Sequence, residues 1–265
     1  MREAIRRFMQ RRAVDLGIYY ILSGGDELTN VGKTNFKKMK NTIKKRENVN
    51  LSDYIEVLNG FHLSLDGLNP LEDLKGKGAL YLGNHTAEGP IRNGNWKLFA
   101  ISYYVKKITG KEIRWTYGQD KSTAQELYRK PVTESINAIS VGERDGSQGV
   151  RDILKAFQNQ DSVGLFPEGK SNKELIRGDP RAGGIVLHAA KKNIPIATIA
   201  AWFGENTCHL SFTLIDNDSI RIMGSGLSNK DESKQEIVDY VMRQIAQNLP
   251  PRLRGYYSEN PSTNS

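Results

Sequence analysis

The chain has 265 residues, of which 38% are hydrophobic, 26% are charged and one is a cysteine. This length and composition favour one large α/β domain with an accessory segment, and they exclude a disordered or collagen-like chain. No apolar run reaches the roughly 18 to 20 residues that span a bilayer, which excludes a transmembrane protein. A lone Cys208 cannot form an internal disulfide, and the first residues lack the apolar core of a secretory signal, so we expect a cytoplasmic protein.

The formal net charge is +8, and nearly all of the excess lies in residues 1–50, which hold 12 Lys and Arg against 5 Asp and Glu. In residues 5–20 the apolar positions recur at helical spacing, with arginines largely on the other side. Such a helix can lie in the interface of an anionic membrane, or its apolar face can pack on the main domain, and both alternatives stay open. No recognised nucleic-acid module accompanies the charge, so we expect no nucleic-acid partner.

Residues 30–50 predict a second basic helix after the glycine break at 24–25. They begin with Val31-Gly32-Lys33-Thr34, which has the ending of a Walker A phosphate loop. That motif needs a glycine five positions before Gly32, where this chain has Glu27, so we exclude a phosphate loop. Lys33 is better explained as part of a solvated basic face.

From about residue 61 onward, strand-like and helical patterns alternate. Short apolar runs predict strands at residues 78–83, 136–141, 162–166, 194–202 and 210–215. Helical patterns fall at residues 96–107, 150–159, 183–192 and 230–248. This alternation predicts an α/β fold with a largely parallel, buried sheet flanked by helices. We therefore divide the chain into a basic helical segment at 1–60, an α/β domain at 61–258 and a flexible tail at 259–265.

Polar residues follow several of the predicted strands. Asn84 and His85 follow the strand at 78–83, in a loop that opens toward a helix. Open α/β sheets place their sites at such strand ends, and a neutral imidazole there can take a proton from a hydroxyl at about pH 7. A histidine considered by itself is more often hydrogen-bonded than catalytic.

Three further blocks accompany this loop. Phe166-Pro167-Glu168-Gly169-Lys170 comes straight after a strand and combines a glycine, a carboxylate and a cation, which suits a closely approaching phosphate. Arg144 lies at another strand end, and Ile194-Pro195-Ile196 has the pattern of a buried strand.

Taken in chain order, the four blocks resemble the glycerophosphate and lysophosphatidic acid acyltransferase family of the PlsC type, over roughly residues 60–205. The family pattern consists of N-H-x4-D, a strand followed by arginine, F-P-E-G-T-R-S and an apolar V-P-I strand. The matching residues are Asn84 and His85, then Arg144, then Phe166, Pro167, Glu168 and Gly169, and finally Ile194, Pro195 and Ile196.

The resemblance implies acyl transfer without a covalent enzyme intermediate. His85 would be the general base on the hydroxyl of a lysophospholipid or glycerol phosphate, which attacks the thioester of acyl-CoA or acyl carrier protein. The acceptor and its phosphate would be bound by Asn84, Arg144, Phe166, Pro167, Glu168, Gly169 and Lys170. No metal and no bound cofactor are expected. Together with the charge of residues 1–50, the resemblance predicts a peripheral protein at the inner face of an anionic membrane.

Two departures from the family pattern affect the predicted site. Pro90 stands where the family has aspartate, and G-K-S-N replaces G-T-R-S. The aspartate holds and stabilises the imidazole, so its loss should weaken catalysis unless another acid serves. Glu88, three residues after His85, is the nearest candidate, although it could equally be an exposed loop residue. Lys170 could supply the charge of the lost arginine.

The resemblance and its departures leave two functions open. The first is an O-acyltransferase, and the alternative is a lipid-binding protein that keeps the scaffold without catalysis. The aromatic-rich stretch at residues 92–120 could line an acyl tunnel, but core packing is the expected explanation.

Overall fold

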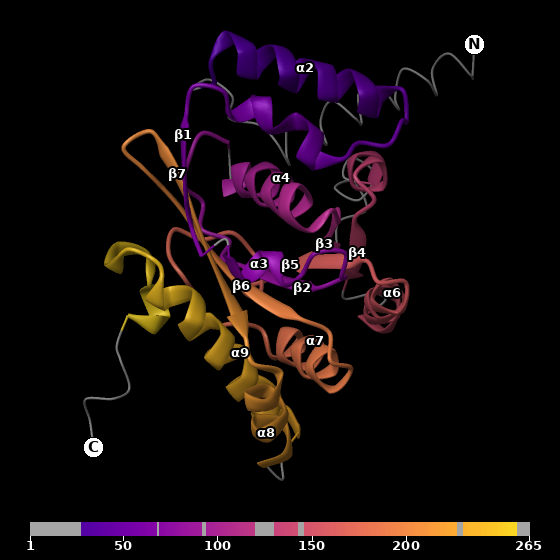
Figure 1. Cartoon of the computed structure of the whole chain (residues 1–265), viewed down its shortest axis with the longest axis vertical. Helices are drawn as coiled ribbons and strands as arrows, with labels where there is room; N and C mark the ends of the chain where they lie inside the picture. Colours follow the sequence, from indigo (N-terminus) through magenta and orange to yellow (C-terminus); the bar gives the residue numbers. More distant parts are fainter. Residues whose placement is uncertain are drawn as a thin grey trace.

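Seven strands form one sheet in the computed structural model, which describes residues 28–67, 69–91, 94–119, 130–142, 146–226 and 230–258. The strands are β1 (His62–Asp66), β2 (Leu80–Gly83), β3 (Ile113–Gln119), β4 (Ile139–Gly142), β5 (Ser162–Leu165), β6 (Ile196–Gly204) and β7 (Thr207–Ile215). Their spatial order is β1-β7-β6-β2-β5-β3-β4 (Figure 1). Neighbouring strands are parallel throughout, except that β7 is antiparallel to β6. The predicted α/β fold with a largely parallel sheet is confirmed.

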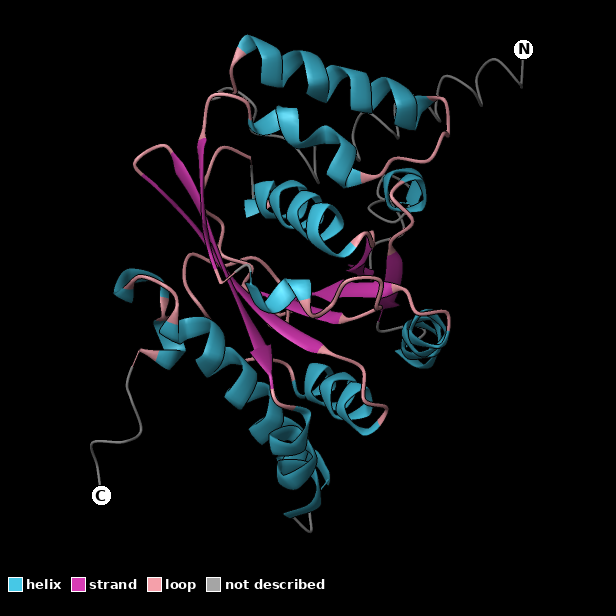
Figure 2. Ribbon diagram, viewed as in Figure 1, coloured by secondary structure: helices cyan, strands magenta, loops and turns pink. Residues whose placement is uncertain are grey.

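Helices cover both faces of this sheet (Figure 2). The α-helices are α2 (Asn30–Lys44), α3 (Asn69–Glu72), α4 (Trp96–Thr109), α6 (Gly146–Gln158), α7 (Pro180–Lys191), α8 (Asn217–Gly226) and α9 (Lys230–Gln247). The 3-10 helices are η2 (Leu51–Leu58), η4 (Pro251–Leu253) and η5 (Gly255–Tyr257). None of the helices within the described ranges is long and apolar enough to cross a membrane.

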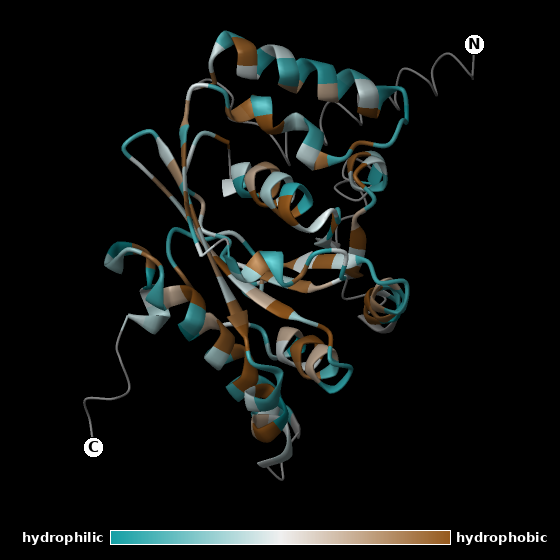
Figure 3. Cartoon of the chain, in the orientation of Figure 1, coloured by the Kyte–Doolittle hydropathy of each residue, from teal (hydrophilic) through white to brown (hydrophobic). Residues whose placement is uncertain are grey.

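Successive side chains of the central strands point to opposite faces of the sheet and pack into two separate cores. Tyr81 of β2 lies in a core with α4, η2 and α2, whereas Leu80 and Leu82 lie in a second core with α6, α7 and α9. The strand period of two explains why one short strand contributes to both cores. Hydrophobic positions accordingly recur along β6, while α2 is largely hydrophilic on its outer side (Figure 3). A sheet buried on both faces explains the nearly continuous apolar runs of the sequence.

Capping residues end or begin several of the predicted helices. Asp179 accepts a hydrogen bond from the Arg181 amide and precedes Pro180 at the first position of α7. Gly110 ends α4 in a left-handed conformation, with a φ of 77°, which glycine adopts at little cost. Thr29 accepts from the Gly32 amide at the start of α2, so the sequence resembling a phosphate loop lies in a regular helix.

The structure departs from the predicted elements at several points. The basic helix expected at 30–50 ends at Lys44. The strand expected at 136–141 starts only at Ile139, because Ile136 still donates to the Val132 carbonyl and Asn137 adopts a φ of 51°. Strands β1 and β3 and helix α8 were not expected. The helix expected at 5–20 and the tail at 259–265 lie outside the described residues.

The described part of the basic segment packs against the sheet domain. Met39, Ile43 and Val57 are fully buried in the same core as Phe99 of α4. Lys106 of α4 also pairs with Glu112 at 2.6 Å and with Asp53 of η2 at 3.1 Å. These contacts join residues 28–58 to the sheet domain, and the proposed division at residue 60 stays a prediction.

Candidate active site at the end of strand β2

The predicted site loop begins at the carboxyl end of β2, between β5 and β6. From β2 the chain continues to α4 on one face of the sheet, whereas from β5 it continues to α7 on the other face. Neighbouring strands whose connections leave to opposite faces create a crevice at their carboxyl ends, which is where open α/β sheets bind ligands. The position of this loop in the fold therefore suits a functional site.

Asn84 fixes the first residue of the loop to the neighbouring strand. Its side-chain amide donates to the Ala201 carbonyl at 2.9 Å and accepts from the Ala201 amide at 2.7 Å. The same amide nitrogen donates to the Thr86 hydroxyl at 2.8 Å. Because Asn84 is fully buried, these contacts extend the pairing of β2 with β6 beyond the last residue of the strand. Its predicted contact with the acceptor substrate stays a prediction.

The second predicted block forms a tight turn after β5. The Phe166 carbonyl accepts from the Gly169 amide at 3.0 Å, Pro167 occupies the second position, and Gly169 has a φ of 70°. Proline at that position presets the turn, and glycine tolerates the left-handed conformation that follows. The turn carries the Glu168 side chain toward the β2 loop, while Lys170 remains exposed at its end.

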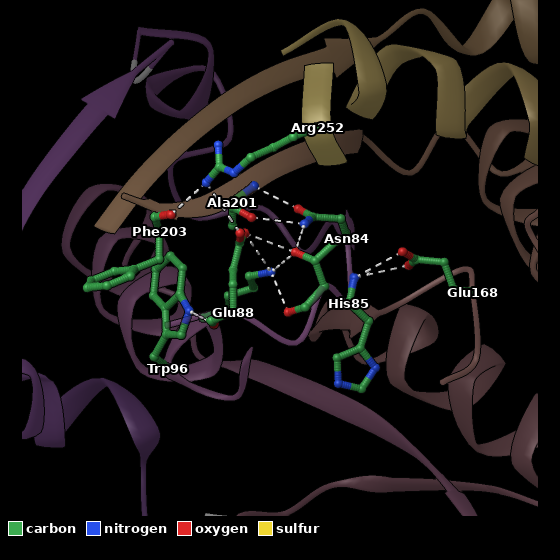
Figure 4. A network of polar contacts seen from close by, with 10 residues as sticks. Asn84, His85, Glu88, Trp96, Glu168, Ala201, Phe203 and Arg252 are labelled. Carbon is green, nitrogen blue, oxygen red and sulfur yellow. Dashed lines mark hydrogen bonds and ion pairs between the residues drawn. The ribbon is translucent and has the colours of Figure 1, made fainter. Parts of the chain in front are cut away.

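Glu168 joins the two predicted blocks. Both of its carboxylate oxygens accept from the His85 amide at 3.1 Å, across 83 residues of sequence (Figure 4). Asn172 adds two main-chain bonds, from its amide to the His85 carbonyl at 3.1 Å and from the Ala87 amide to its carbonyl at 2.7 Å. Burial raises the pKa of Glu168 to about 7, whereas the His85 amide and the Lys97 ammonium lower it.

The imidazole of His85 lies at the end of a column of aromatic rings. It stacks on Phe166 at a centroid distance of 4.5 Å, and Phe166 stacks on Trp115 at 5.1 Å. A Cβ atom at Gly83 would lie 3.1 Å from the Phe166 ring, so the glycine leaves room for this stack. The Nε2 atom of His85 is buried and has no hydrogen-bond partner among the residues that the structure describes.

The electrostatic surroundings keep this imidazole neutral. Burial and the Lys97 ammonium lower the pKa of His85 to about 4, although a side-chain hydrogen bond with Asn95 raises it. At physiological pH the ring is therefore unprotonated, and an unprotonated ring nitrogen can accept a proton.

The Glu88 carboxylate contacts other groups than the His85 imidazole. Its carboxylate accepts from the Thr86 hydroxyl at 3.1 Å and lies 3.9 Å from the Lys97 ammonium and 3.7 Å from the Arg252 guanidinium. Figure 4 shows the His85 ring pointing away from this carboxylate. Burial raises the pKa of Glu88, and Lys97 and Thr86 lower it. Its predicted role as the partner of the imidazole stays a prediction.

Two cations near the loop were missed by the sequence analysis. Lys97 is fully buried in the first turn of α4, and burial lowers its pKa to about 8 while Glu88 raises it. Its spacing of four and eight residues from the buried Ile101 and Val105 places it on the apolar stripe of α4, and this spacing could have revealed it. Arg252 comes from η4, and no local pattern links it to the loop.

The remaining predictions concern Pro167, Arg144 and the aromatic residues of the stretch at 92–120. Pro167 is buried, and its carbonyl accepts from the Asp179 amide at 2.9 Å. Arg144 lies outside the described residues. Trp96 and Trp115 are buried members of the core, which confirms core packing for these two rings. The described residues contain no group of three or more His, Cys, Asp or Glu side chains that could hold a metal ion.

Comparison with known proteins leaves the family of the chain open. No protein-family model matches it, and no curated protein matches it either.

Proposed function

We propose that this chain is an O-acyltransferase that moves a fatty acyl group from acyl-CoA or acyl carrier protein to the hydroxyl of a lysophospholipid or glycerol phosphate. The observation that supports this function best is the hydrogen bond from the His85 main-chain amide to the Glu168 carboxylate, across 83 residues of sequence. It brings together the two blocks whose sequences resemble the acyltransferase family, at the edge of the sheet where ligands bind.

His85 acts as the general base in this proposal. The neutral imidazole takes the proton of the acceptor hydroxyl as its oxygen attacks the thioester carbonyl carbon. A new C–O bond forms, the C–S bond breaks as the tetrahedral intermediate collapses, and the imidazolium returns its proton to the leaving thiolate. Glu168 holds the main chain at His85, so the ring keeps its place during both proton transfers.

The acceptor phosphate is assigned to two cations that the sequence singles out. Lys170 is exposed where the turn ends, and Arg144 is the second predicted cation. A lysophospholipid acceptor requires access to a membrane surface, and the basic residues 1–50 provide charge for anionic headgroups. We therefore propose that the protein works from the cytoplasm at the inner face of a membrane.

The test uses the purified full chain with acyl-CoA and with acyl carrier protein as donors. The acceptors are lysophosphatidic acid, other lysophospholipids and glycerol phosphate, and both the acylated product and the released thiol are measured. We expect at least one donor and acceptor pair to give equal amounts of the two products. Absence of product with every pair, from protein whose fold is verified by circular dichroism, would contradict the proposal.

A lipid-binding protein without catalysis is the second candidate. It is favoured by the surroundings of His85, where the Lys97 ammonium lowers the pKa of the imidazole and Pro90 replaces the aspartate of the family. An ammonium opposes the imidazolium that a general base must become. Saturable binding of lysophospholipid by a protein that transfers no acyl group would identify this function.

A further inference from the structure

Lys97 occupies a position that is unfavourable for a cation. It is fully buried, so its ammonium has lost its hydration, and it lies in the first turn of α4, where the helix dipole favours anions. A lysine in such a place is retained only if its contacts offset these costs. Those contacts lead directly to the loop that carries His85.

The ammonium of Lys97 binds the residue that follows His85. It donates to the Thr86 carbonyl at 2.9 Å and to the Thr86 hydroxyl at 2.5 Å. The same hydroxyl accepts from Asn84 and donates to Glu88 at 3.1 Å. The two neighbours of His85 are therefore anchored to different elements, Asn84 to β6 and Thr86 to α4 (Figure 4).

Carboxylates on two elements face the ammonium. Glu88 lies in the loop itself and Glu168 comes from the turn after β5, and both raise the pKa of Lys97. Arg252 of η4 approaches the other oxygen of Glu88 and donates to the Phe203 carbonyl at 3.0 Å. Trp96 fixes the same loop by donating to the Glu88 carbonyl at 2.7 Å.

We propose that Lys97 is a positioning residue of the acyl-transfer site, which holds the His85 loop in its active conformation through the carbonyl and hydroxyl of Thr86. This inference rests on the proposed function for its catalytic meaning. In this role the fully buried Lys97 touches neither substrate, so its removal should reduce kcat more than it changes the KM of the acceptor.

The test compares Lys97→Met, which keeps the length of the side chain but removes the ammonium, with Lys107→Met at the exposed end of the same helix. Hydrogen exchange is measured at the amides of His85 and Ala87, which bond to Glu168 and Asn172. We expect exchange at both amides to accelerate about tenfold or more in Lys97→Met, the scale of a lost bond to a charged group. Exchange at Val163, within the sheet, should stay unchanged in both variants.

A pair of Thr86 variants separates positioning from general destabilisation. Thr86→Val, which removes the hydroxyl but keeps the charge, should accelerate exchange at the same two amides, and Thr86→Ser should restore wild-type exchange. The Thr86 pair also provides the test if Lys97→Met does not fold.

Unchanged exchange at His85 and Ala87 in folded Lys97→Met would overturn the proposal, and so would equal effects of Thr86→Ser and Thr86→Val. These results do not depend on catalysis. A wild type without acyl transfer refutes the proposed function, whereas normal amide exchange in the variants refutes the positioning role. The two failures are therefore distinguished by different measurements.

Discussion

Glu168 provides a pH-dependent test at the scale of one residue. Burial raises its pKa from an ordinary 4.5 to about 7. The folded protein therefore holds this proton more tightly than the unfolded chain does. Its contribution to the free energy of unfolding is complete below pH 4.5 and is lost as the pH rises through about 7.

Glu168→Gln has no such proton to lose. Relative to the wild type, its free energy of unfolding should therefore increase as the pH rises from about 5 to about 8. Urea unfolding of both proteins across this range measures the difference. Contributions to the free energy of unfolding from groups that titrate in both proteins, such as His85, cancel in this difference. Glu174→Gln removes an exposed carboxyl of the following loop and serves as the control. A difference between Glu168→Gln and wild type that is independent of pH would show that the carboxyl titrates normally.

The residues of the site were only partly predictable. The sequence predicted both His85 and Glu168, because each follows a buried strand and glycines accompany them. The bond between them depends on β2 and β5 being neighbours, which spacing along the chain does not encode. For the same reason, the pairing of Glu88 with Lys97 and Arg252 required three segments to be placed in space.

Helix α2 provides a test at the scale of one element. Its sequence contains no Asp or Glu, and Lys33, Lys37 and Lys38 are exposed on it. Each lysine near an anionic membrane surface contributes about 1 kcal/mol to binding. Replacing all three with glutamate should weaken binding to vesicles that contain phosphatidylserine by about a hundredfold or more.

The matched control makes the same change of charge elsewhere. It replaces Lys155, Lys191 and Lys192, which are exposed on the other side of the sheet, with glutamate. Co-sedimentation with the vesicles at low and high salt measures binding, which salt should weaken. Equal losses in the two triple variants would show that α2 has no special role, and a wild type that does not sediment would exclude the membrane partner.

Elements with strong patterns were predicted, and those with mixed patterns were not. All four residues of β2 and of β5 are buried, and apart from Ser162 none of them carries a strongly polar side chain, so both strands stand out in the sequence. In contrast, β1 lies at the edge of the sheet with exposed ends, and Arg114 interrupts β3. Only Ile220 of α8 is buried, which leaves this helix without an apolar stripe.

At the scale of the whole molecule, the segment that follows α9 is hydrogen-bonded to the loop after the turn at residues 166–169. The Leu175 amide donates to the Leu253 carbonyl at 2.9 Å, and the Leu175 carbonyl accepts from the Tyr256 amide at 3.0 Å. The Tyr257 hydroxyl donates to Asp239 at 2.7 Å and accepts from the Gly178 amide at 3.0 Å. The sequence did not predict this long-range contact, because it joins segments about 80 residues apart.

Tyr257→Phe tests the strength of this contact. Loss of the hydroxyl leaves the Gly178 amide buried without its acceptor, which should reduce the free energy of unfolding by about 1–3 kcal/mol. Tyr256→Phe is the control, because this neighbouring ring is 59% exposed. Chemical denaturation of both variants measures the effect. Equal stability of the two variants would mean that the return of the chain does not depend on the Tyr257 hydroxyl.

The proposed chemistry of the whole molecule depends on His85 as the general base. The most direct test is the rate of acyl transfer by His85→Ala, compared with wild type and with His62→Ala, which removes an exposed histidine of β1. General-base assistance contributes about 10² to 10⁴ in rate, so we expect a loss of this size in His85→Ala only, measured on protein whose fold is verified by circular dichroism. Transfer by folded His85→Ala at the wild-type rate would contradict the assignment.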